Sequence, residues 1–241
     1  NKATLLKVAF FVIIKLNGYK VKSLIFNQIY VHKGEIMEKK VYLIRHSEQL
    51  KIKNEEEKNE QIKNEKIILS VEGEKKAEKL SKISQLQNIE QLWSSNYLRA
   101  ISTAKYISKE NNIEINISSK LNERKLGNLE TLKKMAENKK NSYTTEQLLN
   151  RKLKNKDGES CEEVSKRMKE KIQEIVENGP ENIAIVSHGA AIKFYLSNFC
   201  RIDENINFIY NEKIIIKKNI NSPDMIKLTF SNNSLRNIEH I

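Results

Sequence analysis

From Met37 onward, short apolar runs alternate with stretches that have a helical pattern, and this alternation constrains the fold most strongly. The runs Val41–Ile44 and Ile183–Val186 contain only apolar and aromatic residues. Continuous runs of this length are typical of strands buried on both faces of a parallel sheet. The chain is therefore predicted to form an α/β fold, a three-layer α/β/α sandwich with a mostly parallel sheet.

The other elements are placed by the same patterns. Further strands are predicted to end near Trp93 and to cover 113–117, and two late strands near 213–217 and 225–230 fit a hairpin or a sheet edge. Helices are expected at 97–110, 144–150 and 189–199. Residues 47–68 and 127–156 are polar and irregular, which indicates loops, with some helix possible in the first.

Two helices carry explicit start signals. Ser70 precedes Glu72 and Glu74, so it is a candidate N-cap for a helix with acidic residues in its first turn. Ser160 and Glu163 have the spacing of a capping box for a helix that runs to about Glu177. The sequence Asn178-Gly179-Pro180 then ends it.

The first 36 residues differ from the rest. Residues 4–16 are the most apolar stretch, but Lys7 and Lys15 interrupt it and no cleavage site follows, which favours a helix over a signal peptide. A third interpretation is preferred: Lys33-Gly34-Glu35 can be encoded by a purine-rich stretch just before the codon of Met37. We therefore hypothesise that residues 1–36 are a non-native or loosely packed extension, and that one domain covers 37–241.

Composition limits the classes of partner. The net charge is +12, but single lysines alternate with glutamates and no basic stripe with aromatic residues is present, so nucleic acid is not an expected partner. No apolar run reaches the roughly 20 residues that span a bilayer, so no membrane partner is expected. Cys161 and Cys200 lack metal-binding or disulfide-framework spacing, which favours a cytoplasmic location. The sequence specifies no oligomeric state.

Two histidines directly follow predicted strands, in Ile44-Arg45-His46-Ser47 and Val186-Ser187-His188-Gly189. Ligands of open α/β sheets bind at the carboxyl ends of the strands, so these side chains are candidates for one site. Arg99 lies in the first turn of a predicted helix after a third strand. A cation at that end opposes the helix dipole, which suggests that a bound anion offsets it.

Six motifs in order identify a family. They are Arg45-His46-Ser47, Leu69-Ser70-x-x-Gly73, Ser94-Ser95-x-x-x-Arg99-Ala100-x-x-Thr103-Ala104, Leu121-x-Glu123-x-x-x-Gly127, Gly158-Glu159-Ser160 and Val186-Ser187-His188-Gly189. From Met37 to the C-terminus the chain resembles the histidine phosphatase superfamily, which includes cofactor-dependent phosphoglycerate mutases and many phosphatases. The resemblance implies a phosphoglycerate mutase-like fold.

The resemblance also implies roles for five residues. His46 matches the nucleophile that takes the phosphoryl group, and Glu123 matches the acid and base. Arg45, Arg99 and His188 match the groups that neutralise the phosphoryl oxygens. The implied enzyme is a metal-independent phosphatase of small phosphorylated substrates that forms a phosphohistidine and needs no cofactor.

Three positions depart from the family pattern. Ser47 replaces the usual Gly and is expected to adopt a backbone geometry that Gly accepts more readily. Ile52 replaces an Asn, and Leu129-Glu130-Thr131 replaces Trp-Glu-Gly. These changes concern contacts with the substrate, which the sequence does not identify.

Three other functions share sequence features with a histidine phosphatase. Leu121-Asn122-Glu123-Arg124 resembles the mutase branch, although 127–156 lacks a clear counterpart of the mutase insertion. A non-catalytic phosphate-binding scaffold would not require Glu123. The spacing Cys161-x5-Arg167 matches a cysteine phosphatase, but it falls inside a predicted helix and places two glutamates in the would-be phosphate loop, so Cys161 is expected to be a first-turn helix residue. Cys200 is expected to be buried or partly buried.

Overall fold

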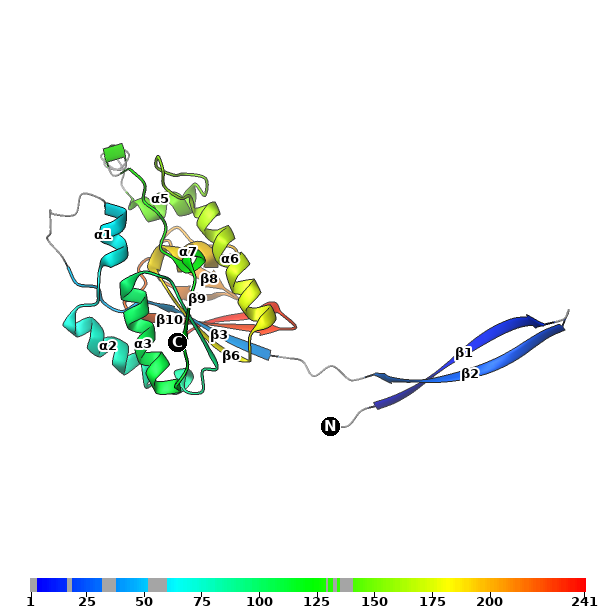
Figure 1. The fold of residues 1–241 in the computed structure, drawn as a ribbon. Helices are drawn as coiled ribbons and strands as arrows, with labels where there is room; N and C mark the ends of the chain where they lie inside the picture. Colours follow the sequence, from blue (N-terminus) through cyan, green and yellow to red (C-terminus); the bar gives the residue numbers. More distant parts are fainter. Residues whose placement is uncertain are drawn as a thin grey trace. The chain divides into compact units, whose positions relative to one another are not determined.

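The computed structural model describes residues 4–16, 19–31, 38–51, 60–128, 130–131, 134 and 141–241. The predictions on Met37 and Ile52, and those on parts of the 47–68 and 127–156 loops including Leu129, lie outside these residues. The chain divides into two compact units, Asn1–Met37 and Glu38–Ile241. All elements from β3 onward in Figure 1 belong to the second unit.

The second unit is built on a six-stranded sheet, in which the strand order is β11-β10-β3-β6-β4-β5. Strands β3, β6, β4 and β5 are parallel to one another, whereas β10 is antiparallel to both β3 and β11. The sheet is therefore mostly parallel, as predicted. Its strands are β3 (Glu38–Arg45), β4 (Gln91–Ser94), β5 (Ile115–Ile117), β6 (Asn182–Ser187), β10 (Asp224–Ser231) and β11 (Ser234–His240).

Alternation along the central strands produces a core on each face of the sheet. Val41 and Leu43 point to one face with Ile185, where they pack against α6 (Cys161–Asn178) and α7 (Gly189–Leu196). Tyr42 and Ile44 point to the other face, where they pack with residues of α3 (Leu98–Asn111). Two cores separated by one sheet make three layers, and the predicted α/β/α sandwich is confirmed (Figure 1).

The predicted helix starts are confirmed at the level of individual hydrogen bonds. The side chain of Ser70 accepts from the N–H of Gly73 at the start of α2 (Val71–Ser81). Ser160 and Glu163 form the complete capping box of α6, and Cys161 is the first residue of that helix. Shorter elements are α1 (Glu60–Lys66), η1 (Ser84–Leu86), η2 (Ser119–Leu121) and α5 (Tyr143–Leu149).

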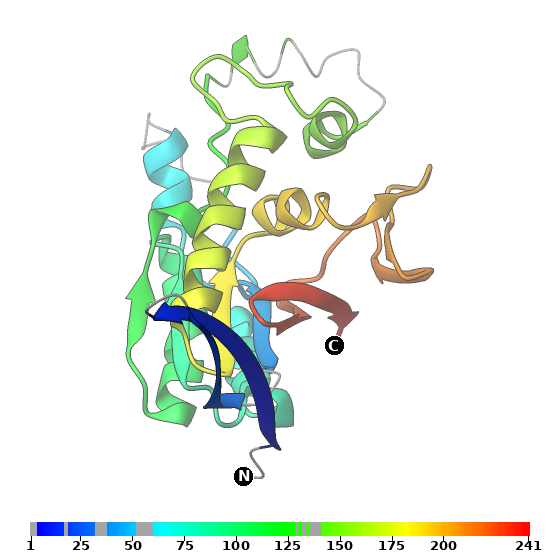
Figure 2. The same cartoon turned by 90° about the vertical axis from the view of Figure 1, so that its right-hand side faces the viewer.

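The late strands do not form the predicted hairpin with each other. β9 (Lys213–Ile216) joins β7 (Arg201–Ile202) and β8 (Phe208–Tyr210) in a separate three-stranded sheet, which follows α7 as the orange segment in Figure 2. β10 instead pairs with β3 and with β11, so it lies inside the main sheet. The physical reason is that Met225, Ile226 and Leu228 are apolar enough to be buried next to the central strand.

The first unit is a two-stranded antiparallel sheet of β1 (Thr4–Leu16) and β2 (Tyr19–Val31), so the helix expected at 4–16 is wrong. Both stretches are rich in β-branched and aromatic residues, which favour strands. That the natural protein starts at Met37 stays a prediction.

Among the described residues, no helix combines the length and the apolar character needed to cross a bilayer. Cys161 and Cys200 are both buried free thiols.

The division into units leads to a prediction for a truncated chain. The described cores consist of residues from Val41 onward, so deletion of residues 1–36 should leave the second unit folded. We expect the melting temperature to change by no more than about 3 °C, which for a domain of this size is at most about 1 kcal/mol. Thermal unfolding followed by circular dichroism measures this. An insoluble product, or a much lower melting temperature, would contradict the prediction.

Candidate active site

The parallel strands β3, β6 and β4 bring the predicted residues to one edge of the sheet. Arg45 is paired in register with Ser187, so His46 and His188 each follow the last residue of neighbouring strands. The N–H of His46 donates to the carbonyl of Ser187 at 2.9 Å, and that of Ser95 donates to Val186 at 3.0 Å. As a result the imidazole ring centres of His46 and His188 are 5.0 Å apart.

The hydrogen bonds of His46 define its tautomer. Nδ1 lies 2.7 Å from the carbonyl oxygen of Ser47, which can only accept, so Nδ1 carries the hydrogen. Nε2 accepts a hydrogen bond from Nε of Arg99 at 3.1 Å. The side chain is buried, and burial together with the charge of Arg99 lowers the pKa of His46 to about 3. His46 is therefore neutral, with the lone pair on Nε2.

Ser47 is held by its side chain as well as its backbone. Its N–H donates to Oγ1 of Thr103 at 2.9 Å, and its hydroxyl donates to the carbonyl of Gly73 at 2.7 Å. A Cβ on Gly73 would lie 2.0 Å from the carbonyl oxygen of Glu48, so only glycine fits there. Ser47 is not among the described residues with positive φ, so the expectation that it needs a glycine-like backbone is wrong.

Arg99 is buried in the first turn of α3, with 2% of its surface exposed. Nη1 donates to the carbonyl of Asn64 on α1, and the guanidinium lies 5.1 Å from the ring centre of Tyr97. Among the described residues, no carboxylate lies within 4.0 Å of Arg99 or Arg45. Burial lowers the pKa of both guanidinium groups, but an arginine stays charged. Because neither arginine has a close carboxylate, both are suited to bind an anion.

His188 is fully buried, and its own hydrogen bonds also favour a neutral ring. Nε2 of His188 lies 2.6 Å from Oγ of Ser95, which also accepts from the N–H of Tyr97. In the tautomer in which the Ser95 hydroxyl donates to Nε2, the hydrogen of His188 lies on Nδ1. Burial lowers the pKa of His188 well below its usual value, and the neighbouring His46 lowers it further.

Two buried nitrogen atoms of this site have no hydrogen-bond partner among the residues that the structure describes. They are Nδ1 of His188 and Nε of Arg45. Gly189 gives the guanidinium of Arg45 its space, because a Cβ there would lie 3.3 Å from Nε. A buried donor without an acceptor is costly, so each of these atoms is suited to an oxygen of a bound anion.

The carboxylate of Glu123 lies at the amino end of α7, the helix that begins directly after His188. This carboxylate accepts from the N–H groups of Arg124 at 2.9 Å, Ala190 at 3.2 Å and Ala191 at 3.1 Å. The structure thus brings together all five predicted residues, with Glu123 held at the amino end of α7 and close enough for its charge to act on Arg45 and Arg99.

Two further cationic residues near Glu123 were not predicted as site residues. Arg124 lies over the rings of Tyr143 and Phe194, and its Nε is buried without a partner. Lys193 is buried on α7, and burial together with the charge of Arg45 lowers its pKa to about 8. Lys193 stands within the otherwise apolar stretch Gly189–Leu196, and this signal in the sequence could have marked it as a candidate site residue.

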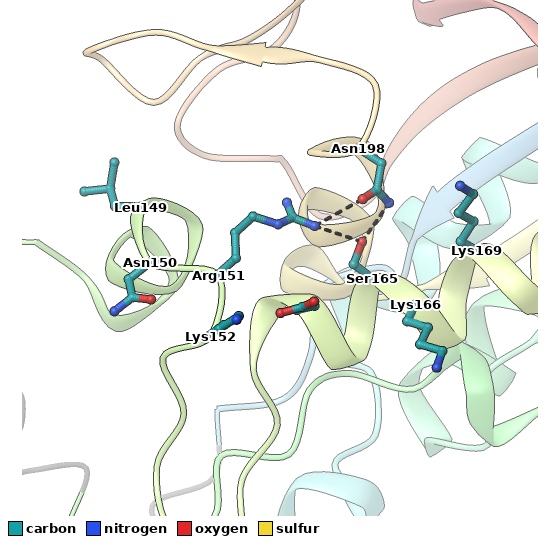
Figure 3. A pocket seen from close by; sticks show the side chains of 9 residues that line it. Leu149, Asn150, Arg151, Lys152, Ser165, Lys166, Lys169 and Asn198 are labelled. Carbon is teal, nitrogen blue, oxygen red and sulfur yellow. Dashed lines mark hydrogen bonds between the residues drawn. The ribbon is translucent and has the colours of Figure 1, made fainter.

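A separate pocket of about 710 Å³ contains none of the five predicted residues. It lies between the end of α5 and the first turns of α6, and Figure 3 shows the guanidinium of Arg151 turned toward Ser165 and Asn198. Its lining is basic and open. The described residues contain no group of three or more His, Cys, Asp or Glu side chains that could hold a metal ion.

Solved structures with similar folds come from several bacteria. A mycobacterial glucosyl-3-phosphoglycerate phosphatase superposes with a TM-score of 0.61 at 14% identity, covering 85% of this chain and 96% of that one. Phosphoglycerate mutase from Bacillus anthracis has a TM-score of 0.61 at 20% identity, with coverage of 86% and 93%. YhfR from Bacillus stearothermophilus has a TM-score of 0.57 at 17% identity, with coverage of 82% and 94%. At such identities the likeness establishes the fold alone.

The family follows from the sequence itself. No curated protein matches the chain. Residues 41–209, however, match the model of the histidine phosphatase superfamily (branch 1). This range includes the ends of β3, β4 and β6 together with Glu123, and it covers more than half of the chain. The chain belongs to the histidine phosphatase superfamily.

Proposed function

We propose that the chain is a phosphatase that hydrolyses phosphomonoesters through a covalent phosphohistidine on Nε2 of His46. The observation that carries this proposal is the state of His46. Its Nδ1–H is used by the carbonyl of Ser47, so the lone pair lies on Nε2, where it accepts from Nε of Arg99. In the proposed reaction a phosphoryl oxygen takes over this N–H, which releases the lone pair for attack. A neutral nucleophile surrounded by cations is what attack on a phosphate dianion requires.

In the first step, the lone pair of Nε2 forms a bond to phosphorus while the ester P–O bond breaks. The unpartnered Nε of Arg45 and Nδ1 of His188 bind the phosphoryl oxygens, together with Arg99. Positive charge aimed at these oxygens stabilises the transition state. Glu123, in its protonated form, gives its proton to the departing oxygen.

In the second step, water attacks the phosphorus and the P–N bond breaks. The electron pair returns to Nε2, and Glu123 takes a proton from the attacking water, which restores the starting state. The carbonyl of Ser47 accepts from Nδ1–H throughout, so it stabilises the positive charge that the ring carries while it is phosphorylated. Because Arg45 and Arg99 supply the positive charge and His188 adds a neutral N–H donor, the mechanism calls on no metal.

A mutase is the second candidate, and one observation favours it. Lys193 is buried and Arg124 is partly buried, and the proposed phosphoryl site near Glu123 does not use either cation. They could bind a second acidic group of a substrate that returns to take the phosphoryl group from His46. Incubation with a phosphoglycerate and its bisphosphate distinguishes the two functions, since a mutase yields the positional isomer whereas a phosphatase yields inorganic phosphate.

Replacement of the nucleophile tests the proposal directly. We expect His46→Ala to lower kcat by on the order of a thousandfold or more, because the covalent route is lost. Acid-labile labelling by a radioactive substrate should disappear with it, while phosphate still binds to the arginines. Phosphate-dependent thermal stabilisation shows that the variant is folded. Hydrolysis at the wild-type rate in His46→Ala would rule the phosphohistidine mechanism out.

The role of Glu123 is tested with leaving groups of different basicity. Glu123→Gln should lower kcat by about 10²–10⁴-fold for alkyl phosphates, which leave poorly without a proton. An aryl phosphate such as 4-nitrophenyl phosphate should lose less than about tenfold, because its oxygen departs unprotonated. Glu170→Gln, an exposed carboxyl on α6, is the matched control. The same loss with both substrates would show that Glu123 is not the proton donor.

The neutral state of His46 predicts a pH dependence of stability. An unfolded histidine takes up a proton near pH 6.5, whereas the folded pKa of His46 is about 3. Between these values the unfolded state binds one proton more, so this residue lowers the free energy of unfolding by about 1.4 kcal/mol per pH unit as the pH falls. His46→Gln should therefore have a slope shallower by about that amount in urea unfolding at pH 6, 5 and 4. Equal slopes would mean that His46 is protonated in the folded protein.

A further inference from the structure

The segment 218–224 connects β9 to β10 and lies beyond residue 209, where the match to the family ends. It is nevertheless bound to the candidate active site by hydrogen bonds from three side chains. Nη1 of Arg45 donates to the carbonyls of Ile220 and Asn221, and Nζ of Lys193 donates to that of Lys218. In the other direction, the hydroxyl of Ser222 donates to the carbonyl of His46 at 2.7 Å.

The contacts with Arg45 determine which edge of its guanidinium is free. Main-chain carbonyls can only accept hydrogen bonds. Those of Ile220 and Asn221 both accept from Nη1 of Arg45. Nε remains buried without a partner. Since a guanidinium is rigid and planar, holding one nitrogen sets the direction of the others. The segment thereby turns the Nε edge toward the place of the phosphoryl group.

The contact with Ser222 holds the main chain of the nucleophile. The N–H of His46 donates to Ser187 on β6, and its carbonyl accepts from Ser222. The residue is thus fixed from both sides, by a neighbouring strand and by the segment. A side chain that must attack in line with a leaving oxygen depends on such support, because small displacements cost large factors in rate.

Asp224 stabilises the conformation of the segment itself. Its Oδ2 accepts from the N–H of Asn221 at 3.0 Å, which closes the turn that presents the two carbonyls. Its Oδ1 accepts from the N–H of Met225 at 3.0 Å and lies 2.6 Å from Nε2 of His240. Asp224 is also paired in register with Arg45 across β10 and β3, so the turn that ends at Asp224 lies beside the arginine.

We propose that Ser222 and Asp224 are positioning residues of the phosphoryl-transfer site. Ser222 orients His46 through its carbonyl, and Asp224 orients Arg45 through the carbonyls of residues 220 and 221. Neither side chain touches the substrate. The inference rests on the proposed function, because it assigns these residues to the step that His46 and Arg45 carry out.

Ser222→Ala tests the inference. Loss of one hydrogen bond of about 1.4 kcal/mol that acts in the transition state should lower kcat about tenfold, with a change in KM below about twofold. Inhibition by vanadate, which mimics the five-coordinate phosphorus, should weaken by a similar factor. Ser222→Thr keeps the hydroxyl and should restore both values. Ser231→Ala, at the opposite end of β10, is the matched control and should leave them unchanged.

Asp224→Asn provides a second variant if Ser222→Ala does not fold. It keeps the size but weakens the acceptor for Asn221, so kcat and vanadate affinity should fall together, several-fold, for alkyl and aryl phosphates alike. That last feature separates it from Glu123→Gln, whose effect depends on the leaving group. Folded Ser222→Ala or Asp224→Asn with wild-type kcat and vanadate affinity would overturn the inference, as would a Ser222→Thr variant as slow as Ser222→Ala.

Acid-labile labelling of His46 separates this outcome from a failure of the proposed function. If the wild type is labelled and Ser222→Ala is labelled at the same rate, only the positioning role is wrong. If the wild type is never labelled and His46→Ala still hydrolyses substrate, the phosphohistidine itself is wrong. Rapid quenching in base, which preserves phosphohistidine, measures the rate of labelling in each variant.

Discussion

The parallel pairing of β3 with β6 is the constraint on which the site depends. Because Arg45 lies opposite Ser187, the two strands end level, and the histidines that follow them are brought within contact. In a sheet shifted by two positions the two strands would no longer end level. The register is held by packing on both faces, because Val41, Leu43 and Ile185 are buried in one core and Tyr42, Ile44 and Val186 in the other. Packing of the interior thus sets the geometry of the edge.

Positive charge is concentrated at this edge of the sheet, on the guanidinium groups of Arg45 and Arg99, which are largely shielded from solvent. Arg45 and Arg99 lack a close carboxylate among the described residues, and the carboxylate of Glu123 is already occupied by main-chain N–H groups. Both histidines respond by staying neutral. This leaves His46 with its lone pair on Nε2 in a region whose charge is suited to an anion, a combination that neither a fully solvated nor an acidic site would produce.

Local and long-range features were not equally predictable from the sequence. The caps at Ser70 and Ser160 depend on residues three positions apart, so they could be recognised directly. The pairing of β10 with β3 joins residues at opposite ends of the domain, and nothing in either stretch specifies the partner. β11 was missed because Ser234–His240 is mostly polar. The contacts of segment 218–224 with Arg45 use main-chain carbonyls, which every residue carries, so they leave no side-chain signature.

The unpartnered nitrogens of Arg45 and His188 have a consequence for the free protein. Inorganic phosphate has the same oxygens as the group that these donors would bind in a phosphomonoester, and it is what the proposed reaction releases. Donors that would hold the phosphoryl group in transit would hold the same group once it is free. If the chain acts as proposed, product inhibition follows from this arrangement, and the rate of turnover in a phosphate-rich medium would be governed by how fast the anion escapes.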